Sequence, residues 1–233
     1  MAKTKEIYLS IVIPAYNEEK RIGATLLAID KYMENQKYAY EILVVSDGST
    51  DKTVDTVKKY KQLVKNLEVI DNLENKGKGA VVRQGLMVVR GTYRVFMDAD
   101  NSTAVDHVEK MWPFFEKGYH IVIGTRDSKD AKGSVQAVKQ PLHRILIGNA
   151  GNLLIQLLAV PGIWDTQCGF KGFSDKAVED IFPRLKINRW GFDIEILAIA
   201  KRLGYKIGIF PVYWENDPKS HVKFTGYLNT FRE

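Results

Sequence analysis

Short apolar runs alternate with helical patterns through the first half of this chain, and this alternation limits the fold more than any other feature. Each run contains β-branched residues and ends where polar or turn-forming residues begin. The runs expected to form strands are Tyr8–Ile13, Glu41–Val45, Leu67–Ile70, Thr92–Met97 and His120–Ile123. Regular strand–helix alternation is typical of a doubly wound sheet with right-handed crossovers. The sequence therefore predicts an α/β fold with a mostly parallel sheet flanked by helices.

Two carboxylates follow the fourth run directly, with one small residue between them. In an open α/β sheet, ligands bind in the crevice beyond the carboxyl ends of the strands. Asp98 and Asp100 are expected to reach that crevice, and Ala99 leaves room for a ligand between them. Such a pair suits a hard divalent cation that also binds substrate phosphates. The alternative is an Asp-rich turn with a helix cap at Ser102 or Thr103, because the Asp-x-Asp pattern is common.

Polar loops follow other predicted strands and are expected at the same edge of the sheet. Ala15–Glu19 follows the first run, and Ser46–Asp51 follows the second. Within the latter loop, Ser49 or Thr50 can cap the next helix. Asn75–Ala80 opens a further helical pattern.

The second half of the chain is less regular. Ser128–Lys139 is polar and basic and predicts a mobile loop, whereas the stretch from Pro141 to Val160 is apolar with a helical pattern. Asp165–Phe173 mixes turn residues with aromatic ones. The remaining predicted elements are helices at Val105–Phe115 and Phe192–Leu203 and a strand at Lys206–Val212.

Composition is that of an ordinary globular domain. The 233 residues are 45% hydrophobic and 27% charged, which predicts a single domain over residues 1–233. The formal net charge of +6 favours anionic partners such as phosphates, nucleic acid or an acidic membrane surface. Cys168 is the only cysteine, so an intrachain disulfide is impossible and a reducing compartment is expected. We see no secretory signal and no run of roughly 18 apolar residues that would span a membrane.

Several enzyme classes that use α/β sheets fit this sequence poorly. A dinucleotide-dependent dehydrogenase needs a glycine-rich turn after the first strand, and Pro14–Glu18 contains no glycine. A P-loop nucleotidase needs Gly-x-x-x-x-Gly-Lys-Ser/Thr, which Gly77–Gly79 does not supply. The four histidines do not have the spacing of metal ligands in a hydrolase. Nucleic-acid binding is not expected either, because no basic stripe with interleaved aromatic residues is present.

The chain resembles the family 2 glycosyltransferases of GT-A fold, especially the dolichyl-phosphate (polyprenyl-phosphate) mannose and glucose synthases. The similarity extends through nearly the whole chain. Each motif alone is weak evidence, but the occurrence of all of them in this order is specific. The motifs are Ile13–Glu18, Val45–Asp51, Asn75–Ala80, Asp98–Asp100, Gly124–Arg126, Gln167–Lys171 and Pro211–Trp214. The resemblance implies a nucleotide-sugar-binding half at 1–126 and an acceptor-binding half at 127–233.

The resemblance also implies roles for single residues. Pro14, Tyr16 and Glu18 match the loop that holds the nucleoside, and Val45 and Asp47 match positions beside the base and ribose.

Further roles concern the metal and the phosphates. Asp98 matches the first aspartate of the Asp-x-Asp motif, and Asp100 matches the metal-binding one, with Ala99 between them. Ser102 stands where relatives often carry Gln as a further metal ligand. Arg126 matches a phosphate-contacting arginine, although it could also pair structurally with a nearby carboxylate.

Two positions in the second half match basic or polar sites around the phosphates, namely Arg144 and His221. Relatives often carry Ser-Lys where this chain has Ser220-His221, so Lys219 or Lys223 could take the place of His221.

The implied reaction is an inverting transfer of a hexose from GDP-mannose or UDP-glucose to a polyprenyl or dolichyl phosphate, with Mg²⁺ or Mn²⁺ as the cofactor. Such an acceptor is already anionic near neutral pH, because the second pKa of a phosphate is about 6. It therefore needs positioning more than a strong base, and Asp165 is the one candidate base. A saccharide hydroxyl acceptor and a non-catalytic sugar-nucleotide-binding protein remain the alternatives.

The order of residues after Arg126 predicts contact with a membrane surface. Basic residues, including Lys129 and Lys132, precede the apolar helical stretch, as in interfacial segments that bind anionic headgroups. The expected location is therefore cytoplasmic, peripheral at the cytoplasmic face of a membrane. The alternative is that the apolar helix simply packs on the sheet.

Overall fold

A seven-stranded sheet forms the centre of the molecule, in the order β3-β2-β1-β4-β7-β5-β8. The computed structural model describes residues 6–136, 153 and 155–214. The strands of the sheet are β1 (Leu9–Ala15), β2 (Tyr40–Asp47), β3 (Leu67–Asn72), β4 (Tyr93–Met97), β5 (Ile121–Thr125), β7 (Phe170–Ser174) and β8 (Ile207–Pro211). Neighbouring strands pair in parallel except β7, which is antiparallel to β4 and β5. The predicted mostly parallel α/β sheet is confirmed.

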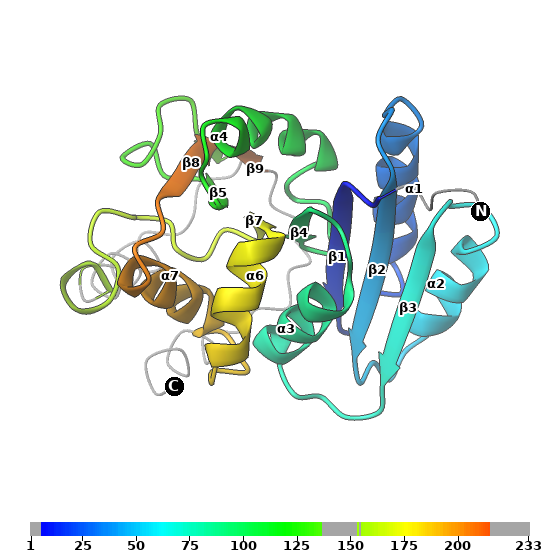
Figure 1. Cartoon of the computed structure of the whole chain (residues 1–233). Coiled ribbons are helices and arrows are strands. Elements are labelled where there is room, and N and C mark those ends of the chain that lie inside the picture. The colour runs from blue at the N-terminus through cyan, green and yellow to red at the C-terminus, as the bar shows by residue number, and fades with distance from the viewer. Residues whose placement is uncertain (1–5, 137–152, 154, 215–233) are drawn as a thin grey trace.

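Helices cover both faces of this sheet (Figure 1). They are α1 (Ile22–Met33), α2 (Thr53–Tyr60), α3 (Lys78–Val88), α4 (Trp112–Glu116), α6 (Asp175–Ile181) and α7 (Phe192–Arg202), with 3-10 helices η1 (Val105–Lys110) and η2 (Phe182–Arg184). Side chains of α1, α2, η1 and α4 pack on one face, and those of α3, α6 and α7 pack on the other. A separate pair of short strands, β6 (Val135–Gln136) and β9 (Tyr213–Trp214), runs in parallel.

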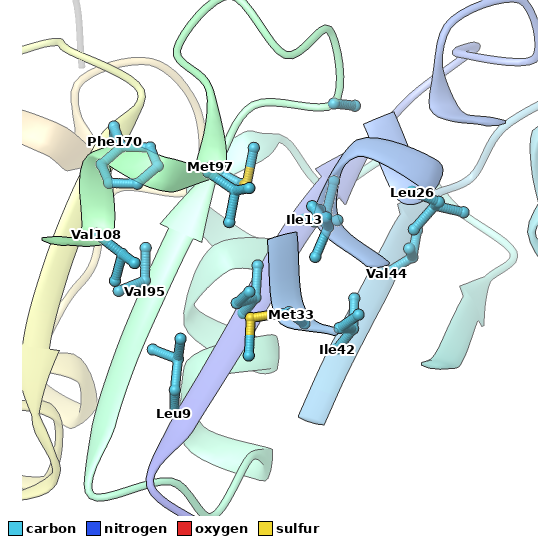
Figure 2. Packing of buried hydrophobic residues seen from close by; sticks show 14 of the residues in the cluster. Leu9, Ile13, Leu26, Met33, Ile42, Val44, Val95, Met97, Val108 and Phe170 are labelled. Atoms are coloured by element: carbon cyan, nitrogen blue, oxygen red, sulfur yellow. The ribbon is translucent and has the colours of Figure 1, made fainter. Parts of the chain in front are cut away.

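Alternation along the strands divides the core into two layers. In β1, Ile11 and Ile13 belong to the layer under α1, whereas Val12 belongs to the layer under α3. Figure 2 shows the first layer, in which Ile13 lies near Leu26 of α1. Because both faces of the sheet are covered, the central strands are apolar at nearly every position, which explains why the sequence shows continuous apolar runs.

Strand β7 was not predicted, because its sequence lacks an apolar run. It reads Phe-Lys-Gly-Phe-Ser, and all five residues are buried. Lys171 has an exposed fraction of 0%, so a charged residue occupies the middle of the sheet. The interpretation of Asp165–Phe173 as a turn region therefore holds only for its first part.

The predicted helix at Val105–Phe115 is wrong as a single element. The structure has η1 up to Lys110 and then the short helix α4, with Pro113 near its start. Proline lacks an N–H group and cannot continue a helix from the preceding turn, so a new helix begins there.

The predicted cap of α2 by Ser49 or Thr50 is also wrong, because the helix begins only at Thr53. Asp51 instead accepts a hydrogen bond from the backbone N–H of Thr53 at 2.9 Å. Ser49 accepts a hydrogen bond from the N–H of Asn17 at 3.2 Å and so connects two loops at the carboxyl edge of the sheet.

Most of the apolar stretch from Pro141 to Val160 lies outside the described residues. Its described end is helical around 155–158, and the side chains of Leu153, Leu157 and Leu158 are exposed. No helix in the part of the chain that the structure describes is both long and apolar enough to cross a membrane.

Candidate active site

A cleft of about 650 Å³ opens beyond the carboxyl ends of β1, β2 and β4. Of the predicted site residues, those that line it are Pro14, Tyr16, Glu18, Asp47, Asp98, Ala99, Asp100 and Arg126. Val45, Ser102 and Asp165 are not among the residues that line it. Arg144 and His221 lie outside the described residues. The cleft therefore gathers loops that are far apart in sequence at the edge where the fold predicts ligand binding.

Asp98 is held on both sides. Lys78 Nζ, at the start of α3, donates a hydrogen bond to Asp98 Oδ1 at 2.5 Å. On the other side, the second carboxylate oxygen lies against Gly169, where an added Cβ would be only 1.9 Å from Asp98 Oδ2. Residue 169 must therefore lack a side chain for Asp98 to keep this position.

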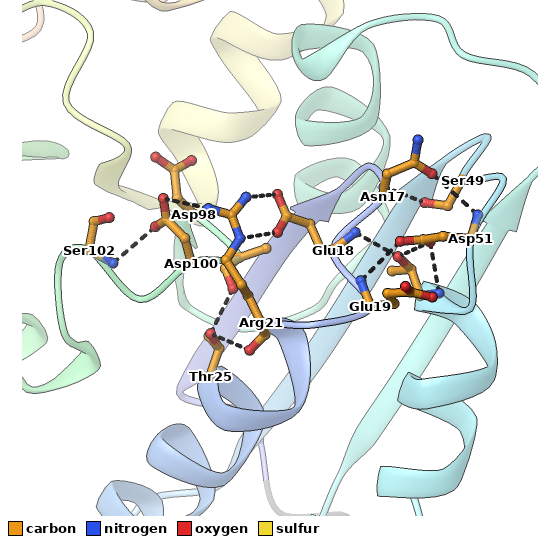
Figure 3. Close-up of polar contacts among 12 residues, drawn as sticks. Asn17, Glu18, Glu19, Arg21, Thr25, Ser49, Asp51, Asp98, Asp100 and Ser102 are labelled. Atoms are coloured by element: carbon orange, nitrogen blue, oxygen red, sulfur yellow. Dashed lines mark hydrogen bonds and ion pairs between the residues drawn. The ribbon is translucent and has the colours of Figure 1, made fainter. Parts of the chain in front are cut away.

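Asp100 points into the cleft from the loop after β4 (Figure 3). Its Oδ1 accepts the backbone N–H of Ser102 at 2.9 Å, and its Oδ2 lies 3.9 Å from Arg21 Nη1. Ser102 itself is buried and contacts Asp100 through its backbone. The metal-binding role of the Ser102 hydroxyl stays a prediction. Neither Ser102 nor Thr103 caps η1, because the residue before η1 is Ala104 and its side chain makes no cap.

The loops after β1 and β2, which the sequence motifs assign to the nucleoside, bind each other at one end of the cleft (Figure 3). The backbone N–H of Glu18 donates to Thr53 Oγ1 at 2.7 Å, and that of Thr50 donates to Asn17 Oδ1 at 2.8 Å. Asn17 has a left-handed backbone with φ of 56°, a conformation that asparagine tolerates well. The tight connection keeps the exposed ring of Tyr16 at the cleft.

Asp47 connects the loop that contains Lys76 and Gly77 to the end of β2. Its carboxylate accepts the backbone N–H groups of Lys76 at 2.7 Å and Gly77 at 3.0 Å. Asp47 therefore has a structural role in addition to its position in the cleft. Val45 is buried in the layer under α3, so its side chain does not face the cleft.

Arg126 forms a bidentate ion pair with Asp165, as the structural alternative in the sequence analysis anticipated. Its Nε and Nη2 lie 2.8 and 2.7 Å from the two carboxylate oxygens, and its backbone N–H donates to Asp165 as well. The guanidinium also lies 5.4 Å from the ring centre of Trp214. Burial opposes ionisation of Asp165, but the attraction of Arg126 is stronger and lowers the pKa of this carboxyl below its usual value.

The cleft fits a hard divalent cation only if the substrate supplies part of the ligands. Among the described residues, no group of three or more His, Cys, Asp or Glu side chains could hold a metal ion. Mg²⁺ commonly binds one or two carboxylates together with substrate phosphates and water. Asp100, which lines the cleft, offers one such carboxylate, and metal binding there stays a prediction.

Comparison with known proteins decides the class of this site. The family described as "Glycosyl transferase family 2" matches residues 10–182, which include all residues that line the cleft except Arg189, Trp190, Asp193 and Trp214. The chain belongs to glycosyltransferase family 2. Its enzymatic activity is glycosyl transfer, and the resemblance seen in the sequence motifs is confirmed.

Curated relatives of this family 2 glycosyltransferase match over nearly its whole length. A dolichyl-phosphate beta-glucosyltransferase of Trichomonas vaginalis is 37% identical over 233 residues, covering 95% of this chain and 70% of the relative. The human dolichyl-phosphate beta-glucosyltransferase is 34% identical over 238 residues, covering 94% and 71%.

Solved structures agree with the fold of this family 2 glycosyltransferase. A glucosyl-3-phosphoglycerate synthase of Mycobacterium tuberculosis in complex with uridine diphosphate has a TM-score of 0.68 at 17% identity, covering 97% of this chain and 76% of that one. A mannosyl-3-phosphoglycerate synthase of Rubrobacter xylanophilus has a TM-score of 0.66 at 18% identity, covering 97% and 72%.

Sequence reasoning missed several cleft residues of this glycosyltransferase. Arg21 forms an ion pair with Glu18 at 2.6 Å, and Lys78 and Asp193 both line the cleft. Lys78 lies in the motif Asn75–Ala80, but the motif does not show which carboxylate the lysine contacts. Asp193 stands in the first turn of a predicted helix, where an acidic residue is expected from the helix dipole alone.

Cys168 has no sign of reactivity. Its side chain is fully buried, and burial raises the pKa of its thiol to about 12. At neutral pH the group is therefore a protonated, inert thiol that packs in the core.

Proposed function

We propose that this glycosyltransferase moves glucose from UDP-glucose to dolichyl phosphate or a related polyprenyl phosphate, with inversion at the anomeric carbon. The observation that carries the proposal is the match over nearly the whole chain with relatives that are named dolichyl-phosphate beta-glucosyltransferases. Those names specify glucose and dolichyl phosphate, so glucose replaces the open choice between mannose and glucose. Those names do not specify the nucleotide, so uridine diphosphate as the carrier of the glucose is also part of the proposal.

The charges in the cleft support a reaction between two anionic substrates. Arg126 lines the cleft, and Asp165 occupies its Nε and Nη2 edge, so a phosphate would bind at Nη1. Fixing the guanidinium in advance lowers the entropy cost of orienting a phosphate. A phosphate acceptor carries its own negative charge, so the reaction needs no strong base.

Asp165 is accordingly assigned to positioning in this proposal, and its sequence-based role as a base is not retained. Its two oxygens receive three hydrogen bonds from Arg126, and its side chain does not line the cleft. A carboxylate held in this way has a lowered pKa and is a poor proton acceptor.

Mg²⁺ or Mn²⁺ is the proposed cofactor, with Asp100 as the main protein ligand. Asp100 lines the cleft, and the backbone N–H of Ser102 donates a hydrogen bond to its Oδ1. When bound, the cation would neutralise the charge that develops on the leaving diphosphate.

A membrane surface completes the proposal, because the acceptor is a lipid. The exposed leucines Leu153, Leu157 and Leu158 follow the basic segment that contains Lys129 and Lys132. Exposed apolar side chains that follow basic ones along the chain support peripheral binding at the cytoplasmic face of a membrane.

A donor and acceptor panel tests the proposed function. Purified protein is mixed with UDP-glucose or GDP-mannose and with a short polyprenyl phosphate or a free saccharide, with Mg²⁺, Mn²⁺ or EDTA, and products are identified by mass. We expect a glucosylated polyprenyl phosphate that requires the cation. A mannosylated product would contradict the donor, a glycosylated saccharide would contradict the acceptor, and full activity in EDTA would contradict the cofactor.

A further inference from the structure

Four side chains of alternating charge connect the cleft to the middle of the sheet. They are Asp98, Lys78, Asp193 and Lys171, and we refer to them as the charge chain. Lys78 Nζ donates to Asp98 Oδ1 at 2.5 Å, and Lys171 Nζ donates to Asp193 Oδ1 at 2.5 Å. Three of the four line the cleft, whereas Lys171 is completely buried on β7.

A close approach of two helices brings the middle of the charge chain together. Gly79 of α3 lies against Phe192 of α7, so closely that an added Cβ would be 2.6 Å from the Phe192 Cβ. Their neighbours along the chain, Lys78 and Asp193, stand at the starts of the two helices, and their opposite charges attract each other. A helix start favours an anion and disfavours a cation, so Lys78 depends on its neighbouring carboxylates.

The charge chain closes into a ring through the backbone before β7. Lys171 Nζ also donates to the carbonyl oxygen of Cys168 at 2.6 Å. The next residue, Gly169, is the one against which Asp98 Oδ2 rests. Asp98 is thus located from one side by a peptide segment that Lys171 contacts and from the other by Lys78, which is related to Lys171 through the charge of Asp193.

The fold alone does not require charges at these positions. Phe173 lies two residues after Lys171, on the same face of β7, and packs in the apolar layer under α3 and α6. Replacing a buried ion pair by apolar side chains of similar volume is often neutral or stabilising, whereas removing one partner leaves an uncompensated charge. A buried pair beside a cleft therefore points to the site rather than to stability.

We propose that Lys171 is a positioning residue: by pairing with Asp193 it keeps Lys78 on Asp98 and so orients the Asp98 carboxylate toward the sugar nucleotide. This inference rests on the proposed function, because it takes the cleft to bind UDP-glucose. Lys171 balances the charge of Asp193, which leaves Lys78 free to pair with Asp98. Without Lys171, Asp193 and Asp98 compete for the same ammonium group.

Variants at Lys171 and Asp193 test the competition. Lys171→Met removes the charge and keeps the volume, so we expect Lys78 to move from Asp98 toward Asp193 and the Kd for UDP-glucose, measured without acceptor, to rise about tenfold. In the double variant Lys171→Met/Asp193→Leu, only Asp98 remains for Lys78, and the Kd should return to within about threefold of wild type. Lys171→Gln, which retains a donor for the Cys168 carbonyl, serves if Lys171→Met does not fold.

Phe173→Leu is the matched control, because it weakens the same strand without changing a charge. It should lower thermal stability and leave the Kd for UDP-glucose unchanged. A crystal structure of the Lys171 variant gives a readout that does not need the donor, namely which carboxylate Lys78 contacts.

The outcomes separate this inference from the proposed function. If the wild type does not bind UDP-glucose, the proposed function is wrong, and the crystal structure still decides whether Lys171 holds Lys78 on Asp98. If the wild type binds but the Lys171 variant has an unchanged Kd, or still shows Lys78 on Asp98, the positioning role is overturned. If the Kd of the double variant stays as high as that of Lys171→Met, competition by Asp193 is not the cause of the loss, and the positioning role is overturned.

Discussion

At the scale of single residues, most charged groups of the cleft already have an opposite charge as neighbour. Lys78 pairs with Asp98, Arg21 with Glu18, and Arg126 with Asp165. These ion pairs hold each side chain in one orientation before a substrate binds. The cleft therefore favours anions whose shape matches the arrangement of its charged groups. Asp100 is the carboxylate whose removal disturbs these pairs least, because its hydrogen bond comes from the backbone of Ser102.

The variant Asp100→Ala tests the metal site. We expect transfer to fall about 100-fold or more, since a bound cation contributes several kcal/mol of charge stabilisation. Stability should fall by only about 1 kcal/mol, because one hydrogen bond to a partly exposed group is lost. Product mass assays and urea unfolding measure the two effects, and Asp71→Ala, an exposed carboxylate at the end of β3, is the control. Activity close to wild type would remove Asp100 from the metal site.

The variant Asp165→Asn tests the ion pair with Arg126 through its pH dependence. Burial alone would raise the pKa of Asp165, but Arg126 outweighs it, and the folded pKa lies below the usual 3.8. The carboxylate therefore contributes its full stability above about pH 4 and loses it as the pH falls through the folded value. We expect the variant to be about 3 kcal/mol less stable at pH 7 and closer to wild type at low pH.

Urea unfolding of both proteins at pH 7 and pH 3 measures this difference. An equal gap at both pH values would show that the loss is one of packing and that the charge of Asp165 does not contribute.

At the scale of elements, glycines set how closely α3 approaches its neighbours. Gly79 faces α7 at the cleft, whereas Gly85, later in the same helix, faces β1, where an added Cβ would be 2.4 Å from Val12 Cγ1. Neither residue has the positive φ that would make a side chain strained, so space alone decides the effect of a substitution.

The pair of variants Gly79→Ala and Gly85→Ala separates packing from site geometry. Both should be destabilised by about 1–3 kcal/mol, because an extra methyl group is forced into a close contact. Only Gly79→Ala should also weaken the binding of UDP-glucose, since it displaces the start of α3 and with it Lys78, which holds Asp98. Thermal unfolding and calorimetric titration measure the two effects. Equal loss of donor affinity in both variants would contradict a specific role for the α3–α7 contact.

At the scale of the whole molecule, three exposed leucines lie close together in the sequence at the described end of the apolar stretch before β7. Leu153, Leu157 and Leu158 are 53%, 70% and 82% exposed. Leu153 and Leu157 are four residues apart and lie on the same side of a helical turn. Lys129, in the preceding loop, lies 4.0 Å from the ring centre of Trp164, and Asp130 of that loop accepts the N–H of Trp164.

Vesicle co-sedimentation tests the proposed membrane surface. The variant Leu157→Ser/Leu158→Ser should reduce the fraction bound to anionic vesicles about tenfold, because two apolar side chains no longer enter the interface. Lys129→Gln/Lys132→Gln should weaken binding at low salt and have little effect at high salt. Leu63→Ser, which changes a leucine that is 66% exposed after α2, is the control. Binding that is unchanged in all variants would contradict docking through this segment.

Strand–helix alternation, the edge of the sheet at which the cleft opens, and the family could all be predicted from the sequence alone. These follow from local patterns, because apolar runs, turn residues and short motifs reflect neighbours along the chain. The same patterns located Asp98, Asp100 and Arg126 at the ends of β4 and β5.

Which groups face one another could be seen only once the chain is folded. The structure shows β7 as an antiparallel strand with Lys171 at its centre, Asp165 as the partner of Arg126, and the pairs Lys78–Asp98 and Lys171–Asp193. These contacts join residues 20 to 39 positions apart in the chain. No local propensity specifies such pairs, because their energies depend on burial and on distances that exist only after the sheet has assembled.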